Sequence, residues 1–205
     1  MHKQAPNQQQ SKADDFPANP IEKPGYRLDF HDEFSTDRLD QNKRYPYMLP
    51  HWTSPENAEA RYLISEGTLK LLIEEDQPAW KPGEGGGFRA SNFQTGVFSG
   101  TKGSSHGQFP LWPGLRVEND QENKRLYTPQ YGYIETRLKA EATQGYHVAL
   151  WLIGYGEKAQ EVGEIVVCEI FGGHDIGQEK SHIRYGIHPW GDPRLNDELY
   201  EQRVE

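Results

Sequence analysis

Cysteine is nearly absent from this 205-residue chain, and long apolar runs are missing altogether. The single cysteine, Cys168, excludes a disulfide within the chain. No run of about 18 apolar residues is present to cross a bilayer as a helix. Residues 1–24 also lack the apolar segment of a secretory signal. We therefore expect no membrane association, and a cytoplasmic location unless a signal lies outside this sequence.

Positive charge is in the minority. The chain has 22 basic and 31 acidic residues, a formal net charge of −9, and its basic residues are scattered along the sequence. Nucleic acids and anionic membrane surfaces are bound by clustered lysine and arginine, so we expect neither as a partner. A neutral polysaccharide suits this charge balance better, and heavily sulfated polymers suit it less well.

The residues that are plentiful favour a β protein. Glycine (21), proline (14), tyrosine (11), phenylalanine (8) and tryptophan (5) together are typical of a turn-rich β sandwich. We expect residues 1–24 to form a disordered polar arm, because they could bury little apolar surface. Residues 25–205 are then long enough for one folded domain.

Alternating apolar and polar residues predict the strands of this domain. Half-buried strands are expected around Leu28 and Phe30, over 68–73 and over 133–140. Residues 147–153 are apolar on both faces, which predicts a strand in the centre of its sheet. Two long loops are expected where glycine and proline cluster, at 78–87 and 100–127. Trp80 and Trp112 in these loops could stack on sugars or simply anchor the loops. Residues 196–205 are compatible with a helical turn.

Two glutamates in one apolar run give the strongest functional signal. Glu164 and Glu169 bracket the segment Ile165–Cys168. Carboxylates among β-branched residues are costly to desolvate unless they are paired or face a wet groove. Two carboxyl groups in one cleft are the equipment for cutting a glycosidic bond. The alternative is an exposed strand with solvated ends.

The spacing adds a structural requirement. Side chains alternate along a strand, so residues five apart point to opposite faces. A β-bulge adds one residue and would bring both glutamates to one face. We therefore predict a bulge near Val166–Cys168, with the carboxyl groups about 5–5.5 Å apart if the chemistry is retaining.

A series of ordered segments supports the same chemistry. With these segments the chain resembles the family 16 glycoside hydrolases, the laminarinase and lichenase group of endo-β-glucanases, from about Tyr26 onward. The resemblance implies a concanavalin A-like β jelly roll with a concave substrate cleft. The segments that carry it are Asp32–Phe34, Gly67–Leu71, Tyr131–Lys139, Gly145–Ile153 and Gly163–Glu169.

The family motif Glu-x-Asp-x-x-Glu assigns roles to these positions. It implies that Glu164 is the nucleophile and Glu169 the acid/base of a retaining endo-hydrolase of β-1,3 or mixed β-1,3-1,4 glucans. No cofactor is implied. A structural calcium occurs in many relatives, with no ligands identifiable here. The complete domain would be a monomer.

The chain also departs from the family pattern. Val166 stands where the family has aspartate, so the alternative is a non-catalytic carbohydrate-binding protein on the same scaffold. His147 stands where the family usually has tryptophan. Family members continue with further strands beyond the point matching Glu205, so we expect a domain that is incomplete at its C-terminus.

Further residues are candidates for contacts with the substrate. Trp151, Tyr155, Phe171 and Trp190 could form subsite walls or pack into the core. His147 looks cleft-facing, and His188 is either a substrate contact or structural. A thiol or zinc site made from Cys168 and the C-terminal histidines fits no compact ligand spacing.

Overall fold

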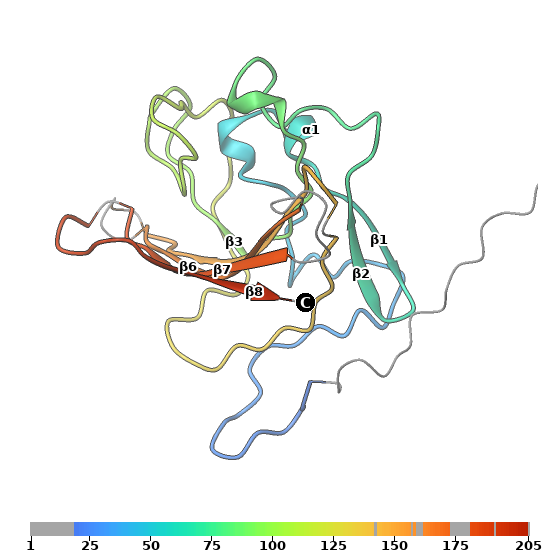
Figure 1. Cartoon of the computed structure of the whole chain (residues 1–205). Coiled ribbons are helices and arrows are strands. Elements are labelled where there is room, and N and C mark those ends of the chain that lie inside the picture. The colour runs from blue at the N-terminus through green and yellow to red at the C-terminus, as the bar shows by residue number, and fades with distance from the viewer. Residues whose placement is uncertain are drawn as a thin grey trace, which may run out of the picture.

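The protein is described here by a computed structural model, which covers residues 19–141, 143–156, 158, 162–172, 181–190 and 192–204. Its structure is all-β, as predicted, with antiparallel strands and little helix (Figure 1). The predicted arm, 1–24, falls mostly outside the described residues. In chain order, the elements are the 3-10 turn η1 (Pro50–Trp52), the helix α1 (Pro55–Ala58), β1 (Arg61–Ser65), β2 (Thr68–Leu72), the 3-10 turn η2 (Gly85–Gly87), β3 (Gly96–Val97), β4 (Lys124–Arg125), β5 (His147–Ile153), β6 (Glu164–Phe171), β7 (Ser181–His188) and β8 (Glu198–Val204).

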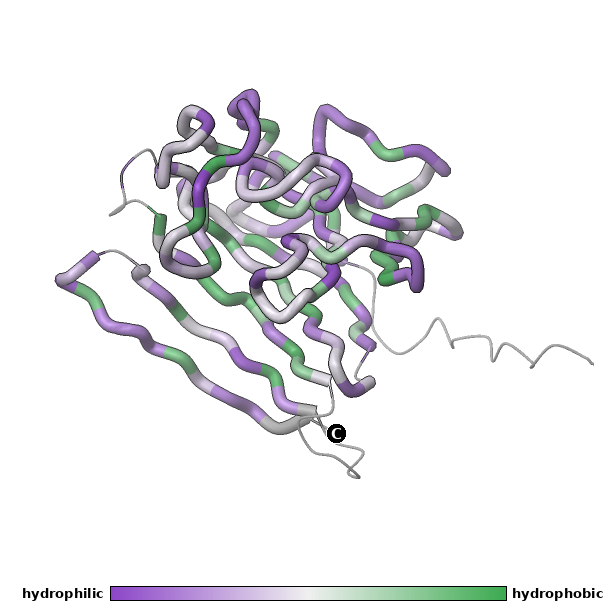
Figure 2. The backbone as a smooth tube through the Cα atoms, turned by 90° about the horizontal axis from the view of Figure 1, so that it is seen from above, coloured by the Kyte–Doolittle hydropathy of each residue, from purple (hydrophilic) through white to green (hydrophobic). Residues whose placement is uncertain are grey.

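A four-stranded antiparallel sheet in the order β5-β6-β7-β8 dominates the second half of the chain. The hairpin β1-β2 and the short pair β3-β4 form two smaller sheets. Long loops between β2 and β4 lie over one face of the large sheet (green, Figure 1). We call this the site face, and the opposite one the back face. Seen from above, hydrophilic and hydrophobic residues alternate along the outer strands (Figure 2).

The main hydrophobic core lies between the loops and the site face. Trp52 and Trp80 are fully buried in it. Trp151 and Ile153 of β5 pack against this cluster. Trp80 Nε1 donates a hydrogen bond to the Met48 carbonyl oxygen (2.6 Å). Trp80 is therefore a loop anchor rather than a sugar platform.

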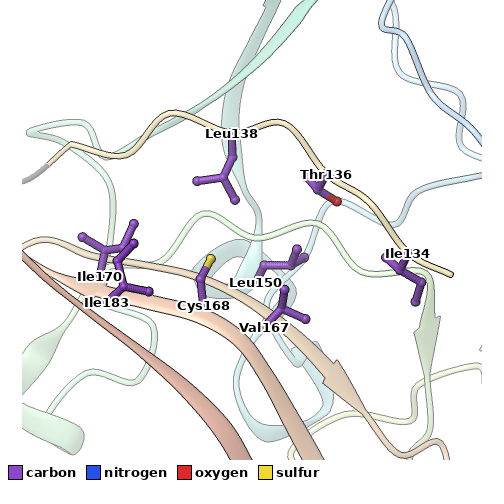
Figure 3. Close-up of a pocket in the computed structure, with 8 residues that line it drawn as sticks. All are labelled: Ile134, Thr136, Leu138, Leu150, Val167, Cys168, Ile170 and Ile183. Carbon is purple, nitrogen blue, oxygen red and sulfur yellow. The ribbon is translucent and has the colours of Figure 1, made fainter. Parts of the chain in front are cut away.

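The back face is apolar and only partly covered. The extended segment 134–138 crosses it, and this segment and the sheet enclose a cavity of about 270 Å³ (Figure 3). Ile165 and Val167 on this face are 51% and 41% exposed. Such exposed apolar surface on a sheet promotes association.

Several sequence predictions of local structure were wrong. Residues 28–30 and 133–140 are not in strands, because no described segment pairs with them in a ladder. Residues 147–153 form β5 as predicted, but this strand is an edge of its sheet as described, not the centre. Its two-sided apolarity arises because loops cover one face and the segment 134–138 the other. Residues 198–204, for which the sequence analysis assigned no element, form a strand because they pair along β7.

Candidate active site

The predicted β-bulge is present in β6. Against β5, Leu150 pairs with Cys168 while Trp151 pairs with Val166, so Val167 is the extra residue. The register against β7 shifts over the same interval, between Val166 and Glu169. This confirms the bulge that the five-residue spacing requires.

The bulge places both glutamates on the site face. Glu164 and Glu169 are only 3% and 8% exposed, and Val166 between them is 2% exposed. Ile165 and Val167 point to the back face and are exposed there. Val166 therefore occupies the position between the two carboxyl groups, where it offers no polar atom.

Glu164 is surrounded by groups from the end of β7 and the turn that follows. Trp190 Nε1 donates a hydrogen bond of 2.9 Å to Glu164 Oε2. His188 lies opposite Glu164 in the sheet register. Burial raises the pKa of Glu164, and the Trp190 hydrogen bond and the charge of His188 only partly oppose that rise.

Glu169 has cationic neighbours on both adjacent strands. His147 Nε2 of β5 lies 3.1 Å from Glu169 Oε1, and Arg184 Nη1 of β7 lies 3.9 Å from Glu169 Oε2. Burial alone would raise the pKa of Glu169. The hydrogen bond and charge of His147 together with the charge of Arg184 outweigh burial, so the net shift is downward.

Two aromatic candidates lie beside these glutamates. Phe171 stacks on His147 with ring centres 4.4 Å apart and planes 5° apart. Trp151 pairs directly with Val166 across the ladder, and its ring packs against Phe109 at 5.9 Å. The buried Trp151 Nε1 makes no hydrogen bond of full geometry among the described residues, but its N–H is close enough to Glu169 to contribute to the lowered pKa of that carboxyl group.

The other candidates divide between the site and the loops. Trp190 is half exposed and lies 4.7 Å from the His188 ring, measured between ring centres. His188 Nδ1 lies 3.2 Å from Asp197 Oδ1, just before β8, without the geometry of a hydrogen bond. Tyr155 instead packs against Phe98 and under the Arg125 guanidinium. Its place is therefore with the loop layer.

Arg184 is a site residue that the sequence analysis missed. It lies four positions before His188 on β7, so alternation alone would have placed both side chains on one face. Its guanidinium also lies over the Phe171 ring (4.9 Å) and pairs with Glu201 of β8 (3.0 Å). The alternation of side chains along a strand could have identified Arg184 as a neighbour of His188, but it was not considered for this segment.

The described residues contain no group of three or more His, Cys, Asp or Glu side chains placed to hold a metal ion. Burial raises the pKa of the Cys168 thiol, which leaves it a poor nucleophile. His174, considered with it, lies outside the described residues. No helix in the described part of the chain is long and apolar enough to cross a membrane.

Comparisons with known proteins find similarity to a solved structure. No family model matches the chain, and no curated protein does. Among solved structures, the GlcNAcα1-4Gal releasing endo-β-galactosidase from Clostridium perfringens is similar, with a TM-score of 0.77 and 34% sequence identity. The similarity covers 94% of this chain and 47% of that protein.

This similarity extends to nearly all of the chain. The chain spans about half the length of the endo-β-galactosidase that it matches. Its antiparallel sheets and that match together show a β-sandwich, jelly-roll fold of the glycosidase type.

Proposed function

We propose that this chain carries the catalytic site of a retaining, endo-acting glycoside hydrolase of the family 16 type that acts on β-linked glycans. The observation that carries the proposal is the bulge in β6, which brings Glu164 and Glu169 to one buried face. Without the bulge the two carboxyl groups would lie on opposite sides of the sheet. The similarity to an endo-β-galactosidase supports the same class of reaction.

In the first step, Glu164 attacks the anomeric carbon of the sugar. A bond forms between the Glu164 carboxylate oxygen and that carbon while the glycosidic C–O bond breaks. Glu169 supplies the proton that the departing oxygen takes up. The products are a glycosyl ester on Glu164, a free sugar hydroxyl and an ionised Glu169.

In the second step, the Glu169 carboxylate removes a proton from water. The water oxygen bonds to the anomeric carbon, the ester bond to Glu164 breaks, and both glutamates return to their starting forms. Two displacements at one carbon give net retention. Loss of the negative charge on Glu164 in the ester lowers the pKa of Glu169, which suits its role as a base at that stage.

Without substrate, the pKa shifts of the two glutamates are opposite to those that the first step needs. That step needs Glu164 ionised and Glu169 protonated, yet the pKa of Glu164 is raised and that of Glu169 lowered. Only a minority of molecules carries the active arrangement at any pH. A substrate that displaces water from the site would raise the pKa of Glu169 through desolvation.

Two indications bear on the substrate class, and they name different sugars. The family 16 resemblance favours β-1,3 or mixed-linkage glucans, and the solved structure with 34% identity releases a GlcNAcα1-4Gal disaccharide by cutting a β-galactoside. The aromatic side chains Trp151, Phe171 and Trp190 suit the apolar faces of either sugar. No cofactor enters this chemistry, and the monomeric state and the neutral polysaccharide partner remain predictions.

Val166 supports a second candidate function, binding of glycans without cleavage. A valine on the site face leaves the nucleophile without the neighbouring carboxyl group that the motif would supply. In this case the chain would bind a glycan and release no reducing ends.

Incubation with laminarin, lichenan and glycans ending in GlcNAcα1-4Gal tests both functions. The proposal predicts new reducing ends from at least one of them, with the β anomer formed first in the proton NMR spectrum. Formation of the α anomer first would contradict the retaining mechanism. Binding without any cleavage would favour the second candidate.

A further inference from the structure

Trp190 has an unusual backbone. It lies in the turn after β7 and has a φ of +46°, the left-handed region that non-glycine residues rarely adopt. A bulky residue persists there only when its surroundings fix it, and such strain concentrates at functional sites. The residue is 54% exposed, so burial alone does not explain the conformation.

The turn that carries Trp190 is held on both sides. Asp192 is buried and accepts hydrogen bonds from the Arg194 backbone N–H (3.0 Å) and from the Arg194 guanidinium (2.8 and 2.5 Å). The Asp192 backbone N–H bonds back to the Pro189 carbonyl oxygen (3.2 Å). His188, whose Nδ1 lies 3.2 Å from Asp197 Oδ1, precedes the turn. The backbone next to Trp190 is thus held by contacts within the β7-β8 connection.

The fixed indole points its N–H at Glu164. The donor–acceptor distance of 2.9 Å is that of a normal hydrogen bond to a carboxylate. Phe109 packs its ring edge-on against Trp190 at 5.4 Å, and the His188 ring lies on its other side at 4.7 Å. Val166 lies next to Glu164 on the site face, and it has no polar atom that could hydrogen-bond to the Glu164 carboxyl group.

The other charged groups around Glu164 do not hold its carboxyl group in the same way. His188 on β7, Glu169 on β6 and His147 on β5 act on Glu164 through charge. Glu169 opposes the ionised form of Glu164, and the two histidines favour it. The indole N–H is the hydrogen-bond donor to the Glu164 carboxyl group among the described residues.

We propose that Trp190 is a positioning residue for Glu164, whose indole N–H orients the nucleophilic carboxylate and stabilises its ionised form in place of a polar residue at 166. This proposal rests on the proposed hydrolase function. It differs from a subsite-wall role for Trp190, in which the ring contacts sugar and the N–H is dispensable. The two roles separate because phenylalanine keeps an aromatic ring and lacks the N–H.

Trp190→Phe in the full chain is the primary test. Loss of one hydrogen bond to a charged group predicts a fall in kcat of about 10- to 100-fold, with KM nearly unchanged. Trp112→Phe is the matched control, because Trp112 Nε1 also donates to a carboxylate, Glu84, in an exposed loop (3.3 Å). The control should keep wild-type kcat. A Trp190→Phe effect confined to KM would overturn the proposal in favour of a subsite wall.

A titration without substrate separates this proposal from the proposed function. NMR of chain labelled with ¹³C at the glutamate carboxyl groups should show a higher pKa for Glu164 in Trp190→Phe than in wild type, because the ionised form loses its donor. An unchanged pKa would overturn the proposal whether or not the chain cleaves glycans. If Trp190→Phe fails to fold, the indole ¹H–¹⁵N resonance of Trp190 in the wild-type chain should shift with pH at the pKa of Glu164, and an indole resonance that does not follow Glu164 would overturn the proposal. Wild-type chain without hydrolase activity would instead count against the proposed function.

Discussion

His147 Nε2 and Glu169 Oε1 lie 3.1 Å apart on adjacent strands, and the imidazole stacks face to face on Phe171. The stacked ring cannot turn away without losing that contact. Glu169 is therefore held beside a hydrogen-bonding partner on one strand and Arg184 on the other. This arrangement favours the ionised carboxylate in the resting site.

Replacing this histidine should change the titration of Glu169. His147→Gln keeps a polar side chain but removes the charge, so the pKa of Glu169 should rise above its wild-type value. Carboxyl-carbon NMR against pH measures the shift directly. His31→Gln, at an exposed histidine far along the chain from the site, is the control. An equal pKa for Glu169 in both variants would show that Arg184 and burial alone set its titration.

The same pKa directions predict an acidic pH optimum. The active form has Glu164 ionised and Glu169 protonated, and the two shifts move in opposite directions from the ordinary glutamate value of 4.5. As pH rises through both pKa values, the proton on Glu169 is lost. As pH falls through them, Glu164 becomes protonated. The maximum of kcat/KM against pH should therefore lie in the acidic range, between the pKa values of the two glutamates, and a maximum at neutral pH would contradict the resting-state assignment.

Val166→Asp tests the departure from the family motif. A carboxyl group at 166 would lie opposite Trp151 in the strand register and between the two glutamates. Its negative charge should raise the pKa of both glutamates, which moves the pH optimum to higher pH.

Val166→Asn separates charge from hydrogen bonding in that test. The amide offers Trp151 an acceptor but carries no charge, so it should leave the pH optimum where it is in wild type. A chain that binds glycan and cleaves it only as Val166→Asp would support the binding-protein function for the natural sequence. Equal pH optima for both variants would exclude an electrostatic role for position 166.

The back face predicts association of the isolated chain. Ile165 and Val167 expose apolar side chains beside the cavity behind the sheet, on the face opposite the glutamates. Ile165→Thr with Val167→Thr should lower light scattering during concentration, because both side chains keep β-branching but lose apolar surface. Thr68→Val at an exposed position of β2 is a control for added apolar surface elsewhere. If the wild-type chain is monomeric and unfolds cooperatively at high concentration, the apolar back face does not cause association.

The bulge could be predicted from the sequence because two glutamates five apart in one strand can share a cleft only if a bulge lies between them. The all-β class followed from composition and alternation in the same way. The edge position of β5 could not be predicted, because burial by loops and burial by neighbouring strands leave the same apolar pattern.

The partners of the two glutamates depend on contacts between distant segments. Trp190 reaches Glu164 only because the turn after β7 takes an unusual backbone conformation, which no local pattern specifies. Arg184 meets Glu169 through the shifted register of β6 against β7. Alternation would have placed Arg184 on the right face, but only the register determines which residue it meets.

Azide rescue of the two glutamate variants tests the central claim most directly. Glu164→Ala should abolish hydrolysis of an aryl β-glycoside while the chain stays folded, and azide should restore turnover with the inverted α-glycosyl azide as product. Glu169→Ala should keep the first step on such substrates, since a good leaving group needs little protonation, and azide should give the retained β-glycosyl azide. Unchanged hydrolysis in Glu164→Ala, or the same azide anomer from both variants, would contradict the assignment of Glu164 as nucleophile and Glu169 as acid/base.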